Sequence, residues 1–156
     1  MTEIRGLTLR QPWAYAVASC EKRIENRGWP TTYRGWIAIH ASKSAGPRDE
    51  YEAAAERVAY LARIPLDIVE QGMQTRSAIV AVARLTGICS DALRPEGTVE
   101  PVCGCGPWAV NGQRHFILAD VKCLVRALPC KGALGLWRLP SVVEEAVRDQ
   151  VRVVLS

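Results

Sequence analysis

The segment from Ser77 to Ile88 is a long run of mostly apolar residues, and it constrains the fold more than any other part of the chain. A run of this kind is typical of a β-strand that is covered on both faces, because neither face needs polar side chains. We therefore predict a central strand at this position. A central strand requires neighbours on both sides, and patterns elsewhere in the sequence supply them.

Shorter segments with alternating or apolar character predict these neighbours. In the clearest case, Gly35–Ala41, the side chains of Trp36, Ala38 and His40 point one way and those of Ile37 and Ile39 the other. The remaining predicted strands are Ile4–Arg10, Arg23–Gly28 and Arg114–Leu124.

Helices are predicted between these strands rather than in regular alternation with them. Apolar residues at helical spacing follow Pro12, Pro47 and Ser141, and a short helical turn covers Leu66–Gln71. Short strands with helices at their edges indicate an α+β fold. A PUA-like small mixed or closed β-barrel with flanking helices fits this pattern better than a doubly wound sheet, and closure would protect strand edges.

Length and composition limit the classes of function. A chain of 156 residues, about half of them apolar, suits a single domain that spans residues 1–156. No apolar signal core or membrane-length apolar run is present, so we expect a cytoplasmic protein without a membrane partner. The net charge of +4 permits an anionic partner without requiring one, because no long basic run occurs.

The charged stretch from Lys22 to Arg27 is the clearest functional signal. On a strand, Arg23, Glu25 and Arg27 project to one side and Ile24 to the other. We expect the Lys22 amine, the Glu25 carboxylate and the Arg27 guanidinium to converge on a solvent-accessible hollow beside the first helix. The alternative is a solvated set of ion pairs, which would contribute little energy.

Several motifs in the same order resemble those of the ASCH domain, the activating signal cointegrator 1 homology domain of the PUA-like superfamily. They are Leu7-Thr8-Leu9-Arg10-Gln11-Pro12-Trp13, Lys22-Arg23-Ile24-Glu25-Asn26-Arg27, Tyr33-Arg34-Gly35, Pro107-Trp108, and Lys131-Gly132 with Trp137. The resemblance implies a PUA-like barrel whose cleft is lined by the charged motif. One departure is Cys20, which stands where the family usually has glycine at the end of the helix.

The resemblance implies binding of RNA, single-stranded DNA or a nucleoside. We expect no cofactor. Cations would contact phosphates, and an aromatic residue such as Trp29 or Trp36 would stack on an unpaired base. The candidate nucleic-acid-binding residues are Gln11, Trp13, Lys22, Glu25, Arg27, Trp29, Arg34 and Lys43.

The alternative is a hydrolase that acts on a modified nucleoside or on RNA. Acetylcytidine amidohydrolases of the superfamily use a lysine, a threonine and a glutamate. Lys22 matches that lysine, but Glu25 stands at the threonine position, so the mechanism does not transfer intact. In a variant mechanism the catalytic residues would be Glu25 as general base and Lys22 as oxyanion stabiliser, and His40 or His115 could serve in RNA cleavage.

The chain has six cysteines, of which only Cys103 and Cys105 are closely spaced. They lie in the predicted loop Asp91–Pro107, and their one-residue spacing is shorter than that of common zinc sites. The spacing favours a glycine-flanked turn, so no metal ligand is assigned. Zinc bound by this pair, His115 and a distant cysteine stays open as the alternative.

Overall fold

The computed structural model describes residues 3–90 and 103–155, which form six strands and four helices. The strands are β1 (Ile4–Leu9), β2 (Ile24–Arg27), β3 (Gly35–Ala41), β4 (Ala78–Cys89), β5 (Arg114–Pro129) and β6 (Leu136–Arg138). The helices are α1 (Trp13–Ser19), α2 (Arg48–Ala62), α3 (Leu66–Gly72) and α4 (Ser141–Leu155). Helices and strands are therefore mixed along the chain, which confirms the α+β class.

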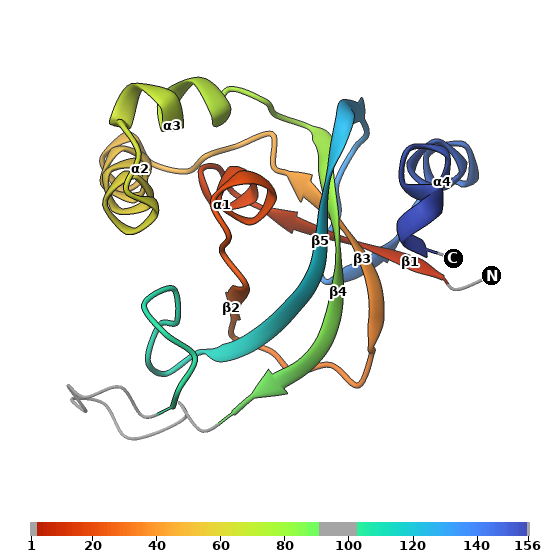
Figure 1. Cartoon of the computed structure of the whole chain (residues 1–156), viewed down its shortest axis with the longest axis horizontal. Helices are drawn as coiled ribbons and strands as arrows, with labels where there is room; N and C mark the ends of the chain where they lie inside the picture. The colour runs from red at the N-terminus through yellow and green to blue at the C-terminus, as the bar shows by residue number, and fades with distance from the viewer. Residues whose placement is uncertain (1–2, 91–102, 156) are drawn as a thin grey trace.

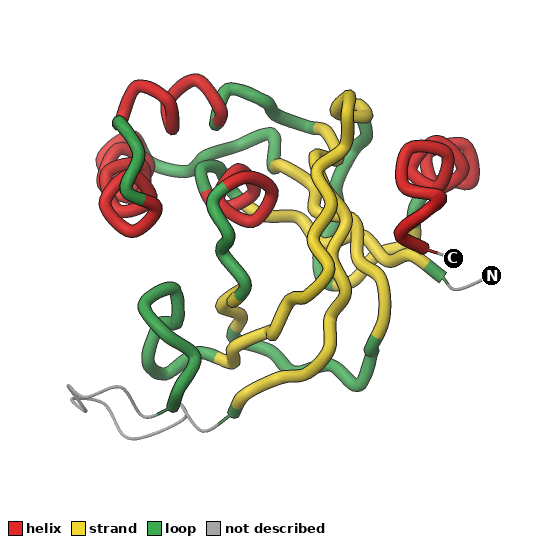
Figure 2. Tube along the Cα trace, viewed as in Figure 1, coloured by secondary structure: helices red, strands yellow, loops and turns green. Residues whose placement is uncertain are grey.

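The strands form one curled, mixed sheet (Figures 1 and 2) in the order β2-β5-β4-β3-β1-β6. Only β1 and β3 pair in parallel, and the other neighbours are antiparallel. β4 lies between β5 and β3, which confirms the central strand predicted from its apolar run. The sheet curls as a half-barrel. Within the described residues it is not closed, because β2 and β6 are its two edges.

Two strands differ from the sequence prediction by more than one residue at an end. β5 continues to Pro129, five residues past the predicted end at Leu124, because Leu128 and Pro129 still pair with the start of β4. β6 was not predicted, since its three residues are too few to show an alternating pattern. Of the predicted loop Asp91–Pro107, residues 91–102 lie outside the described part, and residues 103–107 form turns and bends.

The helices cover the sheet unequally. α1, α2 and α3 lie on one side of it and α4 on the other (Figure 1). On the α1 side, Ala14 and Val17 pack with Leu7, Ile39 and other buried strand residues. On the α4 side, the core is formed by Ile4, Trp36, Ala38, Ile79, Val82, Leu124, Trp137, Leu139, Val147 and Val151. No helix in residues 3–90 and 103–155 has the length and apolarity to span a bilayer.

Candidate nucleic-acid interface

The end of α1 determines where the charged motif begins. Cys20 has φ −119°, an ordinary conformation, whereas the next residue, Glu21, has φ 58°. The family usually has glycine at the position of Cys20. In this protein the residue with left-handed backbone conformation is the next one, Glu21. After this turn, the Lys22 backbone N–H donates to the carbonyl of Ala16, which brings residue 22 back against the helix.

Lys22 is buried and paired. Its side-chain amine donates to Glu25 Oε2 at 2.7 Å and also to the carbonyl oxygen of Ile24. Lys22 is 1 % exposed and Glu25 is 7 % exposed. The expectation that the Lys22 amine reaches a solvent-accessible hollow is therefore wrong, because the amine is used inside the protein to hold the Glu25 carboxylate.

The second oxygen of Glu25 faces Arg27. Arg27 Nε lies 3.2 Å from Glu25 Oε1, while Arg27 Nη2 donates to the Thr8 carbonyl at 2.7 Å. The distance between Arg27 Nε and Glu25 Oε1 suits an ion pair. The buried Nε of Arg27 nevertheless has no hydrogen-bond partner among the described residues. Arg23 does not join this group, and its Nη1 donates instead to the Val17 carbonyl at 3.3 Å.

A cleft of about 820 Å³ opens at this ion pair. Four of the predicted site residues line it: Trp13, Glu25, Arg27 and Trp29. Trp29 is held in place by an edge-to-face contact with Phe116, with ring centroids 5.2 Å apart. The cleft therefore combines two indole rings with a paired carboxylate and guanidinium.

The other lining residues were not identified from the sequence. They are Thr8, Leu9, Arg10, Asn26, Ser42, Ser44, Ala133, Leu134 and Gly135. Arg10 adjoins the Gln-Pro-Trp motif and Asn26 lies inside the charged motif, so both could have been predicted as site residues from these motifs. The residues near 43 and 134 lie in irregular segments, where no sequence period indicates which side chains meet.

The remaining predicted residues lie outside this cleft. Gln11 is buried, with its amide donating to the Thr75 carbonyl and its Oε1 accepting from the Tyr15 N–H. Exposed Arg34 donates to the carbonyls of Thr31 and Tyr33. Trp36 packs in the core on the α4 side, so its predicted role in base stacking is wrong.

Lys43 lines a second cavity of about 680 Å³ that adjoins the cleft. The two hollows share Thr8, Ser42, Ala133 and Leu134 as lining residues. Lys131 also lines the second cavity. Two lysines therefore lie next to the cleft that holds Arg27 and Arg10.

His40 connects this second cavity to the core through a chain of hydrogen bonds. Its Nε2 lies 2.6 Å from the Cys130 carbonyl, and its Nδ1 lies 3.2 Å from Thr8 Oγ1. Because a carbonyl only accepts, Nε2 carries the proton and the Thr8 hydroxyl donates to Nδ1. Trp137 Nε1 donates to the same hydroxyl oxygen at 3.1 Å. With a neutral imidazole, every donor and acceptor in this series of hydrogen bonds therefore has a partner.

Burial lowers the pKa of His40 below its usual value of 6.5, and the bond to the Cys130 carbonyl opposes that shift. The unfolded chain then binds more protons than the folded one below about pH 6.5, so folding stability decreases with falling pH. We expect the free energy of unfolding to be constant just above neutral pH. It should fall from about pH 6.5 downwards, by at most about 1.4 kcal/mol per pH unit from this residue.

Urea titrations of the wild type and of His40→Gln between pH 5 and pH 8 measure this effect. Glutamine can still donate to the Cys130 carbonyl but does not titrate. The wild-type stability should decrease more steeply with acid than that of the variant. Equal slopes for the two proteins would contradict the assignment to His40.

A separate group of side chains brings together Cys89, Cys103, Cys105 and His115. Burial, together with smaller effects of its contacts with Cys103 and Cys89, raises the pKa of Cys105 to about 12. His115 is fully buried and donates from Nε2 to the Val110 carbonyl at 2.7 Å. Neither this histidine nor His40 lines the cleft that holds Glu25.

Comparison with known proteins identifies the family. The sequence model of the ASCH domain matches residues 7–122, which run from the second half of β1 through the first half of β5 and include the entire charged motif. No curated protein matches the chain. The curled mixed sheet with its flanking helices is consistent with the PUA-like architecture of that family. The chain therefore belongs to the ASCH domain family, a PUA-like family whose members generally bind RNA.

Proposed function

We propose that this protein binds single-stranded RNA and takes one unpaired base into the cleft between α1 and the sheet. The observation that carries the proposal is the joint lining of the cleft by Trp13, Trp29, Glu25 and Arg27. Stacking on an aromatic ring contributes about 1–3 kcal/mol per base and does not depend strongly on which base is bound. Membership of a family that generally binds RNA supports the same choice.

The Glu25 carboxylate is suited to read the edge of that base. Its two oxygens hold the Lys22 amine and face Arg27, and each oxygen retains a further lone pair. An ionised carboxylate only accepts hydrogen bonds, so it favours a base edge that presents N–H groups. Adenine and cytosine each present one amino group at that edge and uracil one ring N–H, whereas guanine presents an amino group beside a ring N–H, so guanine is the base that we propose for this position.

The surroundings of the cleft favour a polymer over a free nucleoside. The second cavity, with Lys43 and Lys131, continues from the first and can accept the phosphates of adjoining nucleotides. Leu134 borders both hollows and is 98 % exposed, so it offers an apolar contact to a neighbouring base or sugar. A nucleoside alone would leave the second cavity unused.

The hydrolase alternative gains no support from the position of Lys22. A residue that stabilises an oxyanion must point its donor at the substrate. The Lys22 amine instead donates to Glu25 and to the Ile24 carbonyl, and Lys22 does not line the cleft. Binding without bond cleavage is therefore the function that we propose.

Fluorescence anisotropy with labelled single-stranded RNA, single-stranded DNA of the same sequence and duplex RNA tests this proposal. We expect the single-stranded RNA to bind more tightly than the duplex. The logarithm of its affinity should fall linearly with the logarithm of salt concentration, with a slope of about −0.7 per phosphate contacted. Lys43→Ala should make that slope less negative by about 0.7.

Lys122→Ala is the matched control, because Lys122 is an exposed lysine on β5 outside both cavities. It should leave the salt slope unchanged. Tighter binding of the duplex, or an affinity that does not respond to salt, would overturn the proposal.

A further inference from the structure

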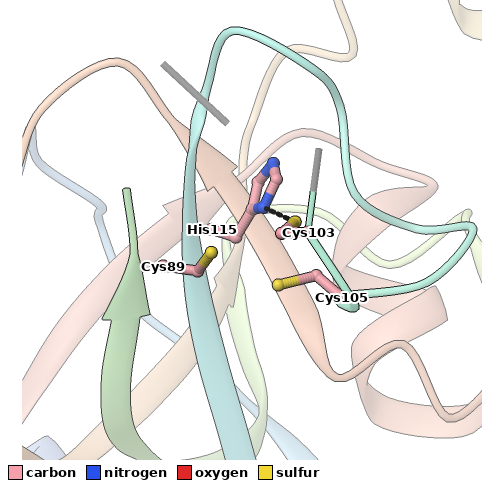
Figure 3. A group of neighbouring side chains, drawn as sticks. All are labelled: Cys89, Cys103, Cys105 and His115. Atoms are coloured by element: carbon pink, nitrogen blue, oxygen red, sulfur yellow. Dashed lines mark hydrogen bonds between the residues drawn. The ribbon is translucent and has the colours of Figure 1, made fainter. Parts of the chain in front are cut away.

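Three cysteines and a histidine converge where β4 ends and β5 begins (Figure 3). The three Sγ atoms and one ring nitrogen of His115 all lie within 4.8 Å of one another. Cys89 and His115 are direct partners across the β4–β5 pair, whereas Cys103 and Cys105 come from the segment that precedes β5. The end of β4, the segment before β5 and the start of β5 therefore supply ligand-forming atoms to one point.

We propose that Cys89, Cys103, Cys105 and His115 bind one Zn²⁺ ion as a structural site. Three cysteines and one histidine are a common donor set of structural zinc sites. In a tetrahedral site with Zn–S of about 2.3 Å and Zn–N of about 2.0 Å, the ligand atoms lie roughly 3.5–3.8 Å apart. The observed cluster therefore needs to contract by only about 1 Å to reach that geometry.

The orientation of His115 supports a metal site. Its Nε2 lies 2.7 Å from the Val110 carbonyl, which fixes the proton on Nε2 and leaves the lone pair of Nδ1 for another partner. Nδ1 faces Cys103 Sγ at 3.4 Å. In metal sites, a ligating histidine usually donates its other ring N–H to a carbonyl or carboxylate in this way.

The donor set also selects the metal. Thiolate and imidazole ligands favour zinc over magnesium or calcium, which prefer oxygen ligands. The cysteines bind as thiolates and release their protons to solvent when the ion enters. Four protein ligands complete a tetrahedron and leave no position for a substrate, so the site is structural and not catalytic.

The ion would fasten the segment before β5 to the sheet, close to the candidate nucleic-acid interface. Asn26, which lines the cleft, donates to the Trp108 carbonyl at 2.9 Å and accepts from the Val110 N–H at 2.8 Å. His115 contacts the carbonyl of the same Val110. The zinc site and the wall of the cleft thus share one segment, although the zinc proposal does not depend on RNA binding.

Elemental analysis of the full chain, purified in the presence of a mild reductant and zinc, tests this inference. We expect one zinc ion per chain. Cobalt substituted into the chelator-treated protein should give the thiolate charge-transfer and d–d absorption bands of a tetrahedral site. Cys105→Ser should lose at least tenfold in metal affinity, and the chelator should lower the melting temperature of the wild type more than that of the variant.

Cys123→Ser is the control, because Cys123 also lies on β5 but outside the cluster. It should keep one zinc ion per chain. If Cys105→Ser does not fold, the cobalt spectrum of the wild type decides alone, since its intensity reports thiolate ligands. A folded wild type that binds neither zinc nor cobalt, or a Cys105→Ser variant that binds zinc as tightly as the wild type, would overturn the inference.

Discussion

Replacing Lys22 with alanine is expected to lower the free energy of unfolding by about 3–5 kcal/mol. The substitution removes the amine that donates to Glu25 Oε2 and to the Ile24 carbonyl, so a 7 % exposed carboxylate loses its buried partner. Removing one member of a buried pair costs more than the pair contributes, because the other charge loses a partner, and Glu25 then keeps only the ion pair with Arg27 at 3.2 Å. The lost packing of the aliphatic chain adds to the effect.

Chemical denaturation of Lys22→Ala, with the wild type as reference, measures this change. The double variant Lys22→Met, Glu25→Gln removes both charges at similar volume and should recover much of the loss. Arg48→Ala serves as the surface control, because the Arg48–Glu52 pair is largely exposed, and it should change stability by less than about 1 kcal/mol. A similarly small effect for Lys22→Ala would show that the pair is not essential to the fold.

Replacing Arg27 with alanine is expected to weaken binding of single-stranded RNA by about 10- to 100-fold. Arg27 lines the cleft, faces Glu25 Oε1 at 3.2 Å and has a buried Nε without a hydrogen-bond partner in the described structure. A hydrogen bond from a charged donor contributes about 1.5–3 kcal/mol, which corresponds to that range of affinity. The expected loss rests on the proposed contact between this guanidinium and the bound nucleotide.

Arg34→Ala is a matched control, since Arg34 is also an arginine of the ASCH motifs but lies outside the cleft. It should bind RNA within about twofold of the wild type, because charge contacts of an exposed residue contribute little. Arg27→Lys keeps the charge but loses the planar fork, and should recover only part of the affinity. Equal losses for Arg27→Ala and Arg34→Ala would place the RNA outside the cleft.

The regular elements could be predicted because their signals are local. Gly35–Ala41 alternates in hydrophobicity and forms β3 over the same residues. The apolar run from Ser77 to Ile88 became the central strand β4, displaced by one residue. β6 could not be predicted in this way, since its strand character comes from pairing with β1 and not from its own three residues.

The candidate site was predictable only in part. The motif located Glu25 and Arg27, and both line the cleft. It did not indicate that Lys22 is buried, because burial depends on how α1 and β2 pack. A lysine in a sequence is normally expected to be exposed. Arg10 and Ser42 reach the cleft because parallel pairing of β1 with β3 brings the ends of these strands together.

The sequence by itself determined the strand and helix order and the family of this protein, because periodicity and motif order are properties of neighbouring residues. The tertiary structure alone decided which charged groups face solvent and which thiols meet. Cys89 and His115 stand 26 positions apart, yet the β4–β5 register places them opposite each other. Register and packing are set by contacts between distant segments, which no local pattern encodes.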